Sequence, residues 1–233
     1  MQGDHERRAA LGRERSDQLI AAAVAAAETR SAAEIAVALV PRAEPYRLTA
    51  LLSAVMIFAL VDMVFGWRGD TLVTWLATWL ASWTVPVVGS GVTNWLGPII
   101  AVLLAIVLFL ACEHTSLGVM LTPPALRRQA CLARARLLFL DHGIDATEDR
   151  LGLLICVCEA ERHIEILPDR GIAAAIPAER WATLIAAFRD HKRKVPLEAA
   201  LVQLIALVAD ELAPRFPFWA GQSNELPDRP FRV

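Results

Sequence analysis

The residues of this sequence best suited to chemistry are acidic side chains that border two short apolar runs. Carboxylates that meet at the ends of strands could hold a hard divalent cation such as Ca²⁺ or Mg²⁺, which prefers oxygen ligands. A cation held there could polarise a phosphoryl group and generate a nucleophilic water, which is the chemistry of a metal-dependent phosphatase. The candidate metal-binding residues are Asp145, Asp149, Glu159, Glu161 and Asp169.

The same carboxylates have a simpler interpretation. Turns between strands are commonly acidic and solvated, and Glu161 could pair with Arg162 or Arg150. Dedicated cation loops repeat their ligands at fixed intervals, and the five carboxylates show no such spacing. The spacing therefore favours solvated turns, and it identifies no catalytic residue.

Histidine and cysteine side chains next to these carboxylates also have two interpretations. His163 could act as an acid or base near neutral pH. It alternates with Glu165, however, and is predicted to lie on the wetter face of its strand. Cys156 and Cys158 could bind a soft metal, but two cysteines in an apolar strand are typical of core packing. With no framework spacing, all the cysteines are predicted to be free buried thiols: Cys112, Cys131, Cys156 and Cys158.

Two segments are so apolar that they are expected to lie in a bilayer. Hydrophobic residues make up 56% of the chain, and the excess is concentrated between residues 48 and 112. Segments 48–66 and 94–112 each have the length of about 20 residues that crosses a hydrocarbon core. Asp62, in the first segment, is the intramembrane polar candidate. It is expected to reach the interface or to bond across to the second span.

The arginines predict how these spans are oriented. Arg42 and Arg47 precede the first span, Arg127 and Arg128 follow the second, and the connection carries only Arg68. By the positive-inside rule, both termini and the soluble residues are predicted to be cytoplasmic, with the chain in a bacterial inner membrane.

The segment at about 71–88 leaves two topologies open. It is apolar enough for a third crossing, but Trp75, Trp79 and Trp83 recur every four residues and form one indole stripe. Such a stripe is typical of a helix at the headgroup level. An interfacial or re-entrant helix is therefore the favoured interpretation.

The remaining residues show the pattern of an α/β domain. Apolar residues at helical spacing predict helices, and continuous or alternating apolar runs predict strands. The helices are expected at 16–29, 124–140, 178–191 and 197–212, and the strands at 34–40, 152–158 and 163–167.

Each helix is expected to bury one apolar side against a sheet. For helix 16–29 that side is Leu19, Ile20, Ala23, Val24 and Ala27, and for helix 124–140 it is Leu126, Ala130, Ala133, Leu137 and Leu140.

The strand at 152–158 needs a second neighbour. It is apolar on both faces, which is typical of a central strand, and a two-stranded hairpin with 163–167 would bury too little to be stable. The other good strand of the chain is 34–40, on the far side of the apolar segments. We therefore expect these strands to pair, with the membrane segments inserted between them.

The order of these elements and the segment Gly143–Gly171 resemble the TPM domain family, named from a thylakoid lumen protein, a photosystem repair protein and a receptor accessory protein. The residues that carry the resemblance are a Gly-Ile before a Thr, the strand GLLICVCE, and Glu161-Arg162 turning into an Ile-x-Ile strand. It covers residues 14–46 and 122–213. The resemblance implies helices on both sides of a small mixed β-sheet. The roles that it implies include acid-phosphatase-like activity with divalent-ion binding, photosystem repair and receptor modulation.

The chain departs from the family pattern in two places that bear on phosphatase activity. Only Gly171 remains of a Gly-x-Gly commonly found after the second hairpin strand, and an aspartate-bearing segment before the first helix has no counterpart.

The predicted organisation follows from these observations. Residues 1–46 and 122–213 form a split TPM-like domain, 47–113 form a membrane insertion, and 214–233 form a tail rich in proline and aromatic residues. The tail could dock on a partner, lie on the membrane or fold back on the domain.

The predicted function is a membrane-tethered binding or accessory module that modulates a membrane protein complex, and the alternative is the metal-dependent phosphatase. The expected partners are the bilayer and a membrane protein, and oligomerisation is open. A net charge of −2 creates no field that favours nucleic acid.

Overall fold

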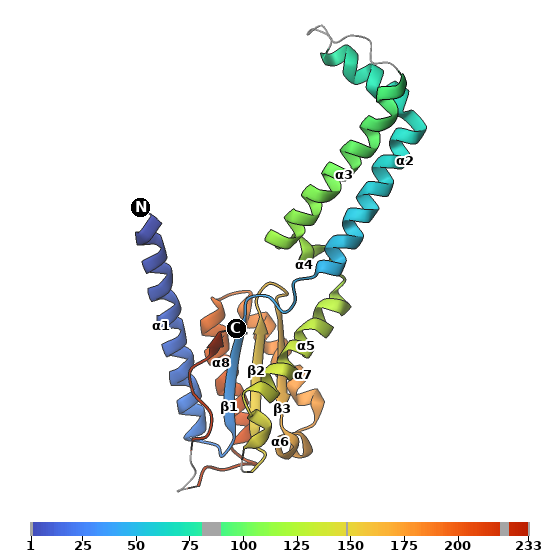
Figure 1. The fold of residues 1–233 in the computed structure, drawn as a ribbon. Helices are drawn as coiled ribbons and strands as arrows, with labels where there is room; N and C mark the ends of the chain where they lie inside the picture. The colour runs from blue at the N-terminus through green and yellow to red at the C-terminus, as the bar shows by residue number, and fades with distance from the viewer. Residues whose placement is uncertain (1, 81–89, 148, 220–223, 233) are drawn as a thin grey trace. The chain divides into compact units, whose positions relative to one another are not determined.

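The structure is a computed structural model, and it describes residues 2–80, 90–147, 149–219 and 224–232 of the chain (Figure 1). The chain divides into an α/β unit, residues 1–44 and 128–233, and a helical unit, residues 45–127.

A four-stranded mixed sheet is the centre of the α/β unit, with strand order β3-β2-β1-β4. The pairing predicted across the apolar segments is confirmed, because β1 and β2 are parallel neighbours in register from Glu34↔Gly152 to Val40↔Cys158. β2 and β3 form the expected antiparallel hairpin. The strands are β1 (Glu34–Val40), β2 (Gly152–Cys158), β3 (His163–Pro168) and β4 (Phe231–Arg232).

The two central strands are buried along their whole length. This burial is what the continuous apolar runs predicted, since a central strand covered on both faces has no side that faces water. One face of the sheet packs against α1 (Gln2–Glu28), α7 (Ala178–Lys192) and α8 (Leu197–Leu212). Residues of all three helices join the main core, among them Val24, Trp181, Phe188, Leu204 and Val208.

Helix α1 is longer than predicted, and its C-terminal part packs on the sheet. It begins at Gln2 instead of Ser16, and the residues that it buries are Ile20, Val24 and Ala27. Leu19, expected in the core, is 52% exposed. Ile20, Val24 and Ala27 form the buried stripe, and Leu19 lies about 100° around the helix from Ile20, at the edge of that stripe.

The opposite face of the sheet is covered by α5 (Pro124–Asp141), which lies in front of the strands in Figure 1. The predicted inward side of this helix is wrong except at Ala130. Its buried residues are Ala130, Cys131, Ala135 and Leu138, whereas Leu126, Leu137 and Leu140 are exposed. Three of the four buried side chains, Ala130, Cys131 and Ala135, are small.

A disulfide joins this helix to the sheet, between Cys131 of α5 and Cys158 of β2, with their Cα atoms 6.2 Å apart. The prediction of free thiols is therefore wrong for these two cysteines. It is confirmed for Cys112 and Cys156, which are buried and unbonded to another sulfur.

Short connections surround the start of β2. The helical turn η1 (Ile144–Ala146) lies against Gly152, where an added Cβ would come within 2.3 Å of the Ile144 carbonyl oxygen. Gly171, at the start of α6 (Arg170–Ala175), is as tightly placed, because a Cβ there would lie 2.7 Å from the Arg150 carbonyl oxygen. Only glycine fits at either position.

The C-terminal tail folds back on the α/β unit in the part that the structure describes. β4 pairs with β1, the Phe231 ring stacks on His142 at 3.8 Å between centroids, and the Arg232 guanidinium pairs with Asp17. Phe218 and Trp219 remain exposed.

The helical unit consists of α2 (Arg47–Leu80), α3 (Ser90–His114) and the short α4 (Leu117–Leu121). α2 and α3 pack along each other, and the Arg47 guanidinium pairs with the Glu113 carboxylate at 3.3 Å, so the start of α2 and the end of α3 lie together. By length and composition, one helix in the described residues could cross a membrane, at Arg47–Val64, and the apolar stretch Pro98–His114 is shorter.

The indole stripe expected near residues 71–88 falls mostly outside what the structure describes. Residues up to Leu80 continue α2 as one helix, so no separate helix begins at residue 71. Trp83 lies outside the described residues, as do the side chains of Trp75 and Trp79.

Candidate functional site

The five predicted metal-binding carboxylates divide between opposite ends of the sheet. Asp145 and Asp149 precede β2, and Asp169 follows β3, whose last residue pairs with Leu153 near the start of β2. Glu159 and Glu161 lie in the turn at the other end of the same hairpin. Because a strand rises about 3.3 Å per residue, the seven residues of β2 keep the two groups about 20 Å apart.

The two buried members of the set have structural roles. Glu161 accepts a hydrogen bond from the backbone N–H of Ala43 at 3.0 Å, which fixes the chain after β1 to the hairpin turn. Asp169 is the N-cap of α6 and accepts from the N–H of Arg170 at 2.7 Å. Among the described residues, no three histidine, cysteine, aspartate or glutamate side chains form a group that could hold a metal ion.

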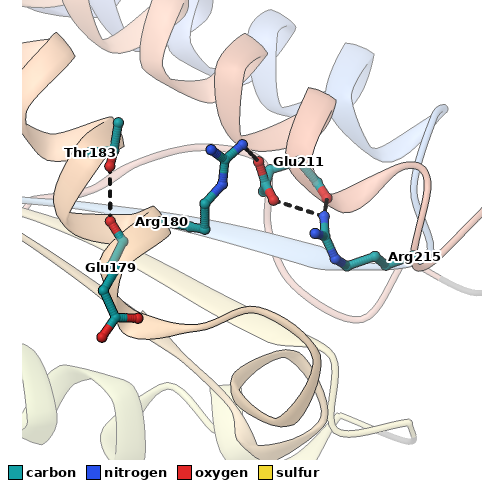
Figure 2. Close-up of polar contacts among 5 residues, drawn as sticks. All are labelled: Glu179, Arg180, Thr183, Glu211 and Arg215. Atoms are coloured by element: carbon teal, nitrogen blue, oxygen red, sulfur yellow. Dashed lines mark hydrogen bonds and ion pairs between the residues drawn. The ribbon is translucent and has the colours of Figure 1, made fainter.

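A buried carboxylate elsewhere, Glu211 of α8, is bound by two arginines (Figure 2). Arg180 of α7 donates to Oε2 at 2.6 Å, and Arg215 donates to Oε1 at 2.7 Å. The hydrogen bond from Arg180 is the main cause that holds the pKa of Glu211 below its usual value. With both oxygens engaged, this carboxylate ties α7 to α8 and is a structural element of the core.

A pocket of about 650 Å³ lies where the β2–β3 turn meets the C-terminal end of α7. Its apolar part consists of Val157, Ile164, Phe188 and Leu197. This volume is within the range found for small-molecule sites. The charged side chains that line it are Glu159, Arg162, Arg189, Lys192 and Arg193.

His163 lies in this pocket and is buried, so the prediction of a wetter, surface position is wrong. His163 is paired with Cys158 across the hairpin, and Cys158 is bonded to Cys131 of α5, so this side of β3 faces α5 instead of water. The Arg189 guanidinium lies 3.3 Å from His163 Nδ1, and Glu165 Oε1 lies 2.6 Å from Nε2. A guanidinium can only donate, so Nδ1 accepts, and the imidazole proton on Nε2 is donated to the Glu165 carboxylate.

The Cys156-x-Cys158 pair is not a soft-metal site in this structure. Cys158 is bonded to Cys131. Burial raises the pKa of the Cys156 thiol to about 12, which keeps it protonated and therefore a poor ligand and nucleophile. Core packing, the simpler interpretation, fits both residues. Asp62, the intramembrane candidate, is exposed on α2.

The cations of the pocket are the residues that reasoning from the sequence missed. Three of them come from the basic run Arg189–Lys194, RDHKRK, which is visible in the sequence. The fourth, Arg162, belongs to the hairpin turn, and only the packing of α7 against β3 brings it to the same pocket.

Comparisons with known proteins bear on the fold. No protein-family model matches the chain, and no curated protein matches it. Among solved structures, the chain is similar to the BA42 protein of the psychrophilic bacterium Bizionia argentinensis, determined by NMR. The TM-score is 0.53 at 16% sequence identity, over 94% of this chain and 93% of that one. At this identity the likeness shows the fold alone.

Proposed function

We propose that the protein is a membrane-tethered binding module of TPM type that modulates a partner protein in or at the membrane. The observation that supports the binding role is the leucine face of α5, formed by Leu137 and Leu140, which are 53% and 61% exposed. The sheet-facing side of the same helix is already filled by smaller residues. Exposed leucines one turn apart on an amphipathic helix suit an apolar helix face of a partner.

The tether is the helical unit. Large apolar side chains of α2 and α3 are exposed, among them Leu52, Met56, Leu103 and Val107. Lipid is the solvent in which such surfaces are stable. We propose crossings at 48–66 and 94–112. Because β1 and β2 are neighbours in one sheet, the chain must return to the side from which it left, so the number of crossings is even.

The proposed location of the α/β unit is the cytoplasmic side of a bacterial inner membrane, because arginines flank the two proposed spans on that side. The cytoplasm keeps thiols reduced. The Cys131–Cys158 bond is therefore expected to be open in cells and to close on oxidation, a point that a thiol assay decides directly.

The metal-dependent phosphatase gains no support from a specific observation. Its acidic residues lie at opposite ends of the hairpin, and two of them cap or brace the backbone. The binding module is therefore the function that the geometry supports best.

Photo-crosslinking in intact membranes tests the binding role. A photoreactive residue at Leu137 should give a discrete adduct with a partner, while the same residue at Asp190, exposed on α7, should not. Equal labelling from both positions would refute the leucine face as the docking surface.

Membrane fractionation tests the tether separately. The protein should stay in the pellet after an alkaline carbonate wash, as integral proteins do, and release into the supernatant would refute the tether.

A further inference from the structure

The β2–β3/α7 pocket carries an inference that goes beyond the tethered binding role. Its positive charge is local, because the chain as a whole has a net charge of −2. Four cationic side chains line the pocket beside one carboxylate, Glu159. Within the described residues, neither Arg162 nor Lys192 has an ion-pair partner, and Arg193 reaches Asp190 only at 4.0 Å. Such a concentration of cations raises the local potential toward anions.

Helix electrostatics explain only part of this charge. Arg189 and Lys192 lie in the last turn of α7, where cations are favourable against the negative end of the helix dipole. Arg162 comes from a different element and has no helix end to neutralise. The helix dipole of α7 therefore does not explain why Arg162 lies at the same pocket.

Arg162 also holds a backbone conformation that disfavours its own side chain. Its φ is 52°, in the left-handed region, where glycine or asparagine would close the four-residue turn with less strain. Backbone strain of this kind persists where the surrounding structure imposes it and is found at binding sites. Here it places a guanidinium on the rim of the pocket.

His163 holds the Arg189 side chain in place. Its contact with His163 Nδ1 depends on the imidazole proton residing on Nε2, and the Glu165 carboxylate fixes that tautomer. His163 is thus a positioning residue, since it orients a cation without needing to touch a ligand. The apolar floor, with Phe188 and Ile164 both almost fully buried, lies behind these charges.

We infer that this pocket binds a small organic phosphate or phosphonate, with the dianionic head on the arginines and the lysine and an apolar body on the floor. Guanidinium groups pair with phosphate oxygens through two parallel hydrogen bonds. A volume of about 650 Å³ accommodates a head group with one ring attached.

Titration calorimetry with phenylphosphonate, which is not hydrolysed, tests the inference on the full-length protein in a neutral detergent. The wild type should bind it saturably, and benzyl alcohol, a neutral analogue, should not bind. Arg162→Gly and Lys192→Ala should each weaken binding about tenfold, the effect of losing one charge-assisted hydrogen bond. Arg136→Ala, an exposed arginine on α5 outside the pocket, should bind like the wild type.

Arg162→Gly separates a lost ligand contact from a damaged fold. Because glycine relieves the left-handed strain, its thermal midpoint should equal or exceed that of the wild type while binding falls. Short-chain phosphatidic acid as a second probe assigns the source, since tighter binding than phenylphosphonate indicates a lipid head group and weaker binding a soluble metabolite.

No saturable binding of either probe, or equal affinity in the wild type and both pocket variants, would overturn the inference. The membrane tether and the leucine face of α5 would stand in that case, because neither depends on the pocket.

Discussion

Glu28, the last residue of α1, should make the stability of the α/β unit depend on pH in an unusual direction. Burial is the main cause that raises the pKa of this carboxyl from 4.5 to about 8, and the nearby Glu34 and Asp228 carboxylates raise it further. A hydrogen bond from the Ile35 N–H to Oε1, at 3.2 Å, opposes the shift without cancelling it. At pH 6 the folded protein therefore holds a proton on Glu28 that the unfolded chain has released.

The sign follows from proton linkage. Between pH 4.5 and about 8 the folded state binds more protons than the unfolded state, so the free energy of unfolding falls as the pH rises through this window. A fully buried carboxyl with this shift would lose about 5 kcal/mol at about 1.4 kcal/mol per pH unit. Glu28 is only partly buried, so solvent screening reduces the expected loss to about 1–2 kcal/mol.

The measurement is urea unfolding of the purified protein in detergent at pH 5.5, 6.5, 7.5 and 8.5, for the wild type and Glu28→Gln. Glutamine keeps the acceptor for the Ile35 N–H but cannot ionise, so the variant should lose most of the pH dependence in this range. Glu44→Gln, which removes an exposed carboxylate, should keep the wild-type slope. Equal slopes in the wild type and Glu28→Gln, or stability that rises with pH, would refute the reasoning.

Three further predictions follow from the contacts described above. Glu211→Gln should lower the free energy of unfolding by about 2 kcal/mol, because charge-assisted bonds to a buried group are lost, whereas Asp210→Asn, at an exposed ion pair on the same helix, should cost less than about 0.5 kcal/mol by the same urea assay. Gly152→Ala should cost more than about 2 kcal/mol, or prevent folding, because its Cβ has no room beside η1. In cells, Cys131 and Cys158 should react with a membrane-permeant maleimide after denaturation without prior reduction, and resistance to labelling would place the α/β unit in an oxidising compartment.

The two faces of α5 show where sequence periodicity reaches its limit. The stripe of leucines and alanines correctly predicted an amphipathic helix at 124–140. It could not show which side of the helix faces the sheet, because the side with alanine and cysteine and the side with leucine are both apolar. In α8, in contrast, the larger apolar residues face the core, and Leu201, Leu204 and Val208 are all buried.

The acidic set was misplaced for a different reason. Nearness in sequence to the ends of strands was taken as nearness in space, but an antiparallel hairpin sends its connections to opposite ends. The predicted hairpin already implied that the acidic residues would lie at two opposite ends. The pocket, in contrast, depends on where α7 crosses β3, a packing arrangement between distant segments that the residues of neither element specify.

The sequence by itself determined the features that arise from neighbouring residues. These are the apolar segments, the helices and strands, and the central position of β2, from which the pairing with β1 followed by elimination. Tertiary structure alone decided which side of α5 is buried, that Cys131 meets Cys158, that His163 lies under Arg189, and that Arg162 joins the basic end of α7. Periodicity reports the local chain conformation and the existence of an apolar face, whereas a site is made by contacts between segments far apart in sequence, which are set by the packing of the whole core.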